Sequence, residues 1–390
     1  MYHDAPVSLP RRVLHKSIAA YYRALHLILP IPRLTRHAVR KGQHVGRRTF
    51  YKGVDRLNDI LKKSTLDRVS DPEGPIRLAW ARSPELYYTN IGDALSAVMV
   101  TALSGRVCRK ERFFSFKERI FGVGTIAHNI RGGIAHVWGT GLDAKYNSFD
   151  KSLGRFAAPP HTKIRVHATR GPFSRQAFLN AGIPAPEAYG DPVWVLPSIF
   201  PPAAEKKWDL GVIVHVTELT EFSPDAQTKD HFKRYQIPQE LTGKVKIINT
   251  VVEPTLDAMM DRMEEITSCR RILSVSLHGL VFAESYGIPC MYFYLSGSNN
   301  CHTISLDNEI LDHRVRDLYA AFGRNDLTVY GCDRTLPTDW VAAMKAIDET
   351  WQPAEFDPGP MLDAFPLPLA FDPRQGEPFK NFDLLRQIKL

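Results

Sequence analysis

The chain has 390 residues, about twice the length of an ordinary domain, so we expect two domains. An apolar fraction of 44% is normal for a soluble globular protein, and no stretch approaches the roughly 20 apolar residues that a membrane-spanning helix needs. Five scattered cysteines without C-x-x-C spacing argue against a disulfide framework and against a zinc site, so we expect a protein of the reducing cytoplasm.

Positive charge gathers in the N-terminal segment. The formal net charge is +8, yet residues 1–63 hold 14 Lys and Arg against 3 Asp, so the rest of the chain is slightly acidic. Within this segment, residues 11–29 have apolar side chains at helical spacing with basic residues around them. Such a helix either contacts the inner face of the membrane peripherally or packs on the main body, and both readings stay open. No RNA-binding module accompanies the charge, so we expect no nucleic acid partner.

From residue 76 onward, strand patterns alternate with helix patterns. We predict strands within 76–81, 120–128, 135–144 and 163–168, an apolar helix at about 94–103 that Gly105 ends, and a helix at 172–181. The Pro-rich stretch 198–209 interrupts this alternation and indicates a domain boundary. Strands and helices then alternate again, with helices expected in TLDAMMDRMEEITSC, LVFAESYG, HRVRDLYAAFG and PTDWVAAMKAIDETW and no regular element in the Pro-rich 360s.

This order predicts an α/β fold with two Rossmann-like doubly wound domains, in a layout that resembles that of GT-B glycosyltransferases, preceded by a basic helical N-terminal arm. The predicted boundaries are 1–75 for the arm, 76–200 and 201–350 for the two domains, and 351–390 for a tail that packs back on the body. In such sheets, ligands bind at the carboxyl ends of the strands, where loops lead into helices.

The stretch SVSLHGLVFAESYGIP, residues 274–289, joins a buried strand to a helix that we expect to begin near Leu280. Ser276, His278 and Gly279 therefore stand where the first helical amides face a cleft. A helix N-terminus attracts anions, and a histidine there donates to a phosphate or moves a proton near neutral pH. The alternative is a structural histidine that caps the helix.

Two arginines bracket another helix start, in TRGPFSR. Arg170 lies on the loop and Arg175 in the first turns, with Pro172 at a first-turn position. Two guanidiniums beside a helix N-terminus form a clamp for a carboxylate or a phosphate. The alternative for Arg175 is a solvated helix residue.

Further candidates lie in two glycine-containing loops. In TNIGDALS, Asp93 either accepts a proton from a hydroxyl group or caps the helix that follows. In WGTGLD, the loop of Gly139, Thr140 and Gly141 allows close approach of a ligand to the backbone. Asp191 before a proline is read as a turn residue, and His215 faces either the cleft or the core.

The sequence lacks a Walker loop, a His-x-x-x-His pair and a dinucleotide fingerprint, so we expect neither a metal nor a cofactor.

Taken together, YTNIGDALS, VWGTGLD, RGPFSRQAFLNAGIPAPEAYGDPVWVLP, SVSLHGLVFAESYGIP and RVRDLYAAFGR resemble the polysaccharide pyruvyl transferase family, in particular its exopolysaccharide members. The resemblance covers about residues 76 to 325. It implies a GT-B-like fold and transfer of a carboxyethylidene group from phosphoenolpyruvate to a sugar, usually on a lipid-linked glycan, as a cyclic pyruvate ketal. Many members carry S-x-R-L-H, and here Ser276 stands at the arginine position.

The resemblance also implies roles. His278 is the general acid or phosphate donor, and Asp93 accepts the hydroxyl proton. Arg170, Arg175, Ser276 and Gly279 bind phosphoenolpyruvate, and the C-terminal domain is the donor side. A set of residues on the acceptor side, in the N-terminal domain, binds the lipid-linked oligosaccharide or polysaccharide: Asn90, Gly139, Thr140 and Gly141. Two other functions stay open, a nucleotide-sugar glycosyltransferase and a non-catalytic scaffold for glycan assembly.

Overall fold

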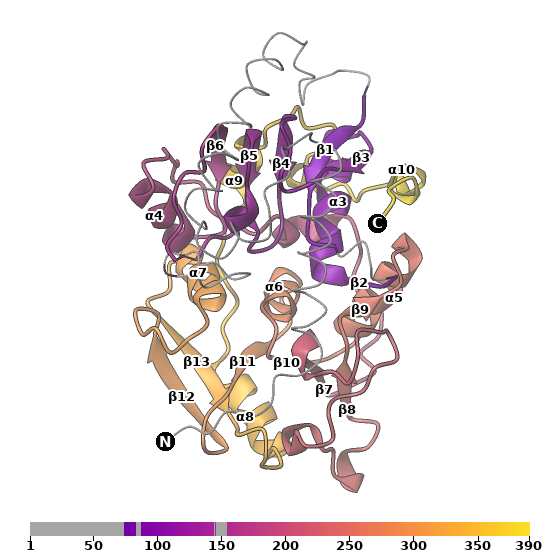
Figure 1. Cartoon of the computed structure of the whole chain (residues 1–390). Helices are drawn as coiled ribbons and strands as arrows, with labels where there is room; N and C mark the ends of the chain where they lie inside the picture. Colours follow the sequence, from indigo (N-terminus) through magenta and orange to yellow (C-terminus); the bar gives the residue numbers. More distant parts are fainter. Residues whose placement is uncertain (1–73, 83–86, 144, 146–153) are drawn as a thin grey trace, which may run out of the picture. The chain divides into compact units, whose positions relative to one another are not determined.

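The computed structural model describes residues 74–82, 87–143, 145 and 154–390. The predicted basic arm, apart from its last two residues, and the predicted helix at 11–29 lie outside these described residues. The first sheet has five parallel strands in the order β3-β1-β4-β5-β6 (Figure 1). They are β1 Ile76–Ala79, β3 Cys108–Lys110, β4 Arg119–Phe121, β5 Gly133–Trp138 and β6 Thr162–Ala168.

The second sheet has six strands in the order β12-β13-β11-β10-β7-β8. Only the edge strand β12 is antiparallel to its neighbour. The strands are β7 Leu210–Ile213, β8 Val245–Ile248, β10 Ile272–Ser274, β11 Cys290–Tyr294, β12 Asn300–Ser305 and β13 Asp326–Gly331. The prediction of an α/β fold with parallel sheets is therefore confirmed, while the predicted domain boundaries stay predictions.

Both sheets reverse their strand order at one point. In the first sheet the chain leaves β1 toward β3 and returns to β4 on the other side of β1. The second sheet repeats this pattern, with β8 and β10 on opposite sides of β7. Loops that leave the two strands at such a point run in opposite directions and leave a crevice at the carboxyl ends of the strands. The sites of interest are therefore the ends of β1 and β4 and the ends of β7 and β10.

The helices match the sequence patterns, with some shifts. They are α3 Ile91–Ser104, α4 Pro172–Asn180, α5 Leu256–Thr267, α6 Leu277–Ser285, α7 His313–Ala321, α8 Trp340–Thr350, α9 Gly359–Asp363 and α10 Phe382–Arg386. Gly105 ends α3 with a left-handed backbone, φ 66°, as predicted. The prediction of no regular element in the 360s is wrong for α9, which is short enough for Pro360 to occupy its first turn. The stretch after Asp191, predicted as a short strand or turn, forms a 3-10 helix at Pro192–Ser198.

A helix that is apolar all round must be buried on all sides, and α3 is such a helix. Nearly all of its residues are buried, in a core that also contains most of α6. A short antiparallel pair, β2 Thr89–Asn90 with β9 Val251–Val252, leads into α3. The starts of α3 and α6 are thereby held in the same core, which brings the loops before both helices together.

The C-terminal segment packs on the first sheet and on α3. The Trp138 indole donates to the Met361 carbonyl at 2.8 Å, and the Ala370 amide donates to the Leu103 carbonyl at 2.7 Å. Figure 1 shows the segment, in yellow, beside these elements. None of the described helices is long and apolar enough to cross a membrane.

Candidate active site

His278 lies at the point where the second sheet reverses its order. Strand β10 ends at Ser274, and α6 begins at Leu277 rather than near Leu280, so His278 belongs to the first helical turn. Gly279 makes this early start possible, because a Cβ there would lie 2.3 Å from the Ser274 hydroxyl oxygen. Gly92, in the first turn of α3, packs against the His278 ring, and a Cβ there would lie 2.2 Å from it.

The His278 imidazole is uncharged at physiological pH. Its Nε2 atom is buried and has no hydrogen-bond partner among the described residues. Burial, and then the nearby charges of Arg314, Arg170 and His215, lower the pKa of His278 to about 3. A buried polar atom without a partner is costly, and such atoms in native structures commonly face a ligand or water. The imidazole therefore lacks a hydrogen-bond partner at Nε2 and lies near the positive charges of Arg314 and Arg170.

The first amides of α6 also lack a side-chain cap. Ser276 is the N-cap residue, yet its side chain accepts no capping hydrogen bond. Instead the Ser274 hydroxyl accepts from the Ser276 amide at 3.1 Å and donates to the Ser276 carbonyl at 2.8 Å. The uncapped helical amides and the helix dipole favour an anion at this position.

The capping reading of Asp93 is wrong, because Asn90 caps α3. The Asn90 side chain accepts from the Gly92 amide at 3.0 Å and donates to the Thr250 hydroxyl at 3.1 Å. Both polar atoms of Asn90 thus have structural partners. The Asp93 carboxyl group makes no hydrogen bond and no ion pair among the described residues, and burial raises its pKa to about 7 against the opposing charges of Arg314 and Lys110. A carboxyl group with this pKa gives and takes protons near neutral pH.

Arg170 is fully buried at the carboxyl end of β6. Its Nη1 donates to the Thr125 hydroxyl at 2.7 Å, and its Nη2 lies 3.2 Å from the Asp317 carboxylate. Its Nε has no hydrogen-bond partner among the described residues. Gly141 lies against this guanidinium, since a Cβ there would come within 2.3 Å of Nη2. A buried guanidinium with donors left over is a strong binder of carboxylate or phosphate.

Asp317, on α7, holds Arg170 and α4 together. Its carboxylate accepts from the Ser174 amide at 2.9 Å and from the Ser174 hydroxyl at 2.5 Å, at the start of α4. Gly171 leaves room for this contact, because a Cβ there would lie 1.9 Å from the Asp317 carbonyl oxygen. Sequence reasoning missed Asp317, although a buried acidic residue in an otherwise amphipathic helix calls for a partner.

Arg314 is the other residue that the sequence reasoning missed. It lies in the first turn of α7, where its Nε and Nη2 donate to both carboxylate oxygens of Asp312 at 2.6 to 3.1 Å. Its charge lowers the pKa of His278 and opposes the rise of the pKa of Asp93. The same guanidinium therefore acts on both candidate proton-transfer groups. Only its place in the motif RVRDLYAAFGR gave a signal in the sequence.

His215 borders this cluster rather than the core. It follows β7, which pairs with β10 so that Ile213 lies opposite Ser274. Its Nδ1 contacts the Thr217 hydroxyl at 2.8 Å, and the side chain is only partly buried. Of the two readings left open for His215, the structure favours the cleft.

Arg175 is not brought to the cluster. Its Nε donates to the Ala185 carbonyl at 3.0 Å, and its Nη2 lies 3.2 Å from the Glu187 carboxylate. These contacts hold the loop after α4. These contacts do not support a role of Arg175 in anion binding, which stays a prediction.

The loop of Gly139, Thr140 and Gly141 is occupied by structural contacts. Gly139 has φ 79° and packs against Pro192, so a side chain does not fit there. The buried Thr140 hydroxyl donates to the Gly124 carbonyl at 2.6 Å. The loop shapes the surroundings of Arg170, and its predicted contact with an acceptor sugar stays untested. Asp191 accepts from the Val193 amide at 3.1 Å, as expected of a turn residue.

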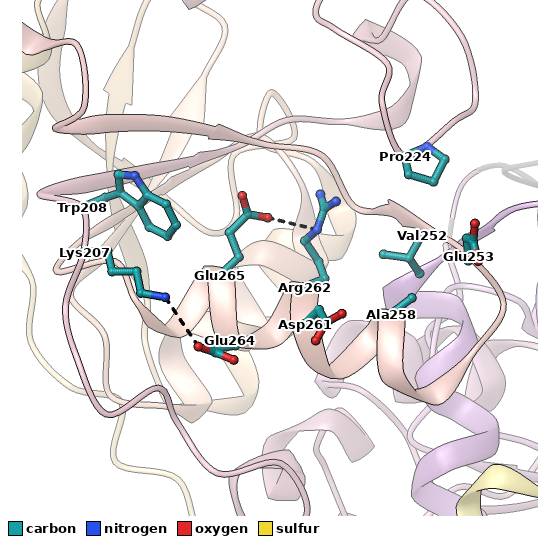
Figure 2. A pocket seen from close by; sticks show the side chains of 10 residues that line it. All are labelled: Lys207, Trp208, Pro224, Val252, Glu253, Ala258, Asp261, Arg262, Glu264 and Glu265. Atoms are coloured by element: carbon teal, nitrogen blue, oxygen red, sulfur yellow. Dashed lines mark ion pairs between the residues drawn. The ribbon is translucent and has the colours of Figure 1, made fainter.

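Two of the cavities in the described part of the chain are considered as ligand sites. A cavity of about 920 Å³ borders Asp312 and His313, next to Arg314. The other, of about 430 Å³, lies along α5 and contains none of the predicted site residues (Figure 2). Two of its four acidic side chains are paired, with Lys207 3.6 Å from Glu264 and Arg262 3.1 Å from Glu265, and Glu253 and Asp261 leave the lining net acidic. The described residues contain no group of three or more potential metal ligands.

The described residues thus form a candidate site for an anion in an α/β protein with parallel sheets. It combines an uncharged histidine, two guanidiniums, free helical amides and a carboxyl group with a pKa of about 7. The family model of polysaccharide pyruvyl transferases matches residues 90–297, just over half of the chain. The chain belongs to this family, and it is an enzyme of this type. Comparisons with curated proteins and with solved structures give no match.

Proposed function

We propose that the enzyme transfers pyruvate from phosphoenolpyruvate to a sugar of a bacterial exopolysaccharide or lipid-linked glycan. The product is a cyclic pyruvate ketal, and inorganic phosphate is released. The observation that carries this proposal is the cluster of the buried Arg170, the partly buried Arg314 and the uncharged His278 beside uncapped helical amides. Phosphoenolpyruvate carries a carboxylate and a phosphate on adjacent groups, so it needs two separate sets of donors.

The hydrogen-bond donors of the site form two sets, one around each guanidinium. Arg170 has a fixed direction, because Thr125 and Asp317 hold its guanidinium. Arg314 is fixed by Asp312 in the same way. We assign one anionic group of phosphoenolpyruvate to each guanidinium, with the amides of Leu277 and Gly279 beside the phosphate. Bound anions would raise the pKa of His278 toward its ordinary range, since they oppose the positive charges that now lower it.

The chemistry has two additions to the same carbon. A proton reaches the methylene carbon, and the first sugar hydroxyl attacks the middle carbon, which has oxocarbenium character. The second hydroxyl then displaces phosphate and closes the ketal, so the two hydroxyl protons end on the methyl group and on the phosphate. Asp93 accepts the hydroxyl proton, and His278, protonated in the complex, is the general acid or phosphate donor. No cofactor or metal takes part in this scheme.

The arrangement of the two sheets that we propose is GT-B-like, with the donor on the side of β7 and β10 and the acceptor toward the first sheet. We also propose a cytoplasmic enzyme that contacts the membrane through residues 11–29, close to a lipid-linked acceptor. The support is the basic amphipathic pattern of that segment.

Ligand-induced stabilisation tests the donor. Phosphoenolpyruvate should raise the melting temperature of the wild type in a concentration-dependent way, and much less that of Arg314→Leu or Arg170→Leu. A nucleoside diphosphate should have no effect. Stabilisation by the nucleoside diphosphate instead would favour a glycosyltransferase, and stabilisation by neither ligand would favour a scaffold.

A further inference from the structure

The larger cavity has the lining of a carbohydrate site. It measures about 920 Å³, within the range of ligand pockets of about 300 to 1,000 Å³. Aromatic rings of Phe173, Tyr292 and Tyr294 form part of its wall, and polar groups of Asp143, Asp312 and His313 form another part. Aromatic faces cover the C–H face of a sugar ring, while carboxylates and imidazoles bond to hydroxyl groups.

We infer that this cavity binds the acceptor glycan, with a pyranose ring against Tyr292 and Tyr294 and its hydroxyl groups toward Asp143 and His313. The role of the bound glycan as acceptor rests on the proposed function. The binding of a sugar in this cavity does not. It differs from the expectation that the loop 139–141 and Asn90 hold the acceptor, since those residues are engaged in structural contacts.

The polar wall is built as a connected unit. The His313 Nδ1 lies 3.4 Å from the Asp143 carboxylate, and the Asp143 amide donates to the His128 Nε2 at 3.0 Å. On the other side of the ring, the His313 Nε2 is buried and has no hydrogen-bond partner among the described residues. A hydroxyl group of a sugar supplies the partner that this nitrogen lacks.

The cavity continues into the candidate active site. Asp312 lines the cavity and holds Arg314, whose charge acts on both His278 and Asp93. Tyr292 lies close enough to Asp312 and Arg314 for both charges to act on its hydroxyl. A sugar in the cavity therefore lies next to the residues that we assign to phosphoenolpyruvate.

The charge of the lining favours a neutral polyol over a nucleotide. The acidic groups Asp143, Asp312 and Glu309 outnumber the cations Lys145 and Arg316, and burial lowers the pKa of the remaining histidine. Lys145 is paired with Glu309. The Arg316 guanidinium stacks on the Phe173 ring at 4.7 Å and donates to the Leu306 carbonyl, so both cations of the lining already have partners.

Two of the side chains that line the cavity are aliphatic and exposed. Leu295 and Ile310 are 42% and 59% exposed. Together they offer an apolar surface on which a ligand larger than one sugar ring can continue. A chain of several sugar residues fits this description better than a single monosaccharide.

Tyr294 gives the sharpest test. It is partly exposed, so its truncation should leave the fold intact. Binding of a panel of methyl pyranosides to the full-length protein is followed by saturation-transfer NMR, and stabilisation by phosphoenolpyruvate is measured in parallel. We expect Tyr294→Ala to weaken the binding of the best glycoside about tenfold, Tyr294→Phe to retain it, and both to keep the response to phosphoenolpyruvate. Tyr87→Ala, at an exposed aromatic residue outside the cavity, is the matched control.

The outcomes separate the two proposals. If no glycoside binds to the wild type, or if Tyr294→Ala binds as the wild type does, the cavity is not the acceptor site. If the wild type binds a glycoside through Tyr294 but does not respond to phosphoenolpyruvate, the acceptor cavity stands and the proposed donor fails.

Discussion

Replacement of Asp93 by asparagine should stabilise the fold while it stops the reaction. Burial raises the pKa of Asp93 from 3.8 to about 7. The folded pKa lies above the unfolded value, so the stability that this carboxyl group contributes is complete below pH 3.8 and is lost as the pH rises through about 7. Asparagine has the same shape and carries no such cost.

The magnitude follows from the two pKa values. Their difference corresponds to about 4 kcal/mol between the fully protonated and the fully ionised limits. Between about pH 5 and about pH 8, the free energy of unfolding of Asp93→Asn should rise relative to that of the wild type by about 2 to 3 kcal/mol.

Urea unfolding at both pH values measures this difference. Asp257→Asn is the control, because Asp257 also lies in the first turn of a helix, α5, but is exposed. Its replacement should cost a few tenths of a kcal/mol at both pH values, through the helix dipole. A difference between wild type and Asp93→Asn that does not change with pH would refute the reasoning, and so would full activity of the variant.

Three further predictions concern the groups around the site. Asp317→Ala should lower the free energy of unfolding by about 3 to 5 kcal/mol in urea unfolding, because it leaves the Arg170 guanidinium buried and without its ion pair; a loss under about 1 kcal/mol would contradict the pairing. Arg314→Leu should raise the pKa of His278 toward 6.5 in an NMR titration of the imidazole, whereas an unchanged value would remove Arg314 from the site. His278→Gln should lose part of the acid sensitivity of the fold, because below about pH 6.5 the unfolded histidine takes up a proton that the folded one does not; equal acid sensitivity of variant and wild type in unfolding at about pH 5 would contradict the lowered pKa.

Local patterns were enough to predict most strands and helices of the described chain. An apolar run that ends at Gly105 predicted α3. Apolar runs followed by glycine-containing loops predicted several of the parallel strands. The strands that were missed are β2, β3, β12 and β13. The first two span two and three residues, and β12 has mostly exposed side chains, so no clear pattern distinguishes them from loops. β13 is longer and mostly buried, and its apolar run was overlooked. The start of α6 was placed three residues late, because a glycine there was read as part of a turn, whereas it leaves room for close packing.

Position in the sequence indicated the candidate residues that come shortly after a strand, and it gave little signal for those on α7. His278, Asp93 and Arg170 follow strands and could be found from their position. Asp317 is 143 positions away from its partner Ser174, and no local pattern reports such a contact. The role of Arg175 was inferred from its place at a helix start and from the family resemblance, and that of the loop 139–141 from its glycines. Their hydrogen bonds now point to structural tasks.

Phosphate release tests the central claim most directly. The full-length enzyme is given phosphoenolpyruvate with and without a membrane glycolipid extract, and the wild type is compared with His278→Ala and with Tyr87→Ala as the control. We predict release that depends on the extract, is retained in Tyr87→Ala and collapses in His278→Ala. Absence of release with every lipid-linked acceptor, or release that His278→Ala leaves unchanged, would contradict pyruvyl transfer at this site.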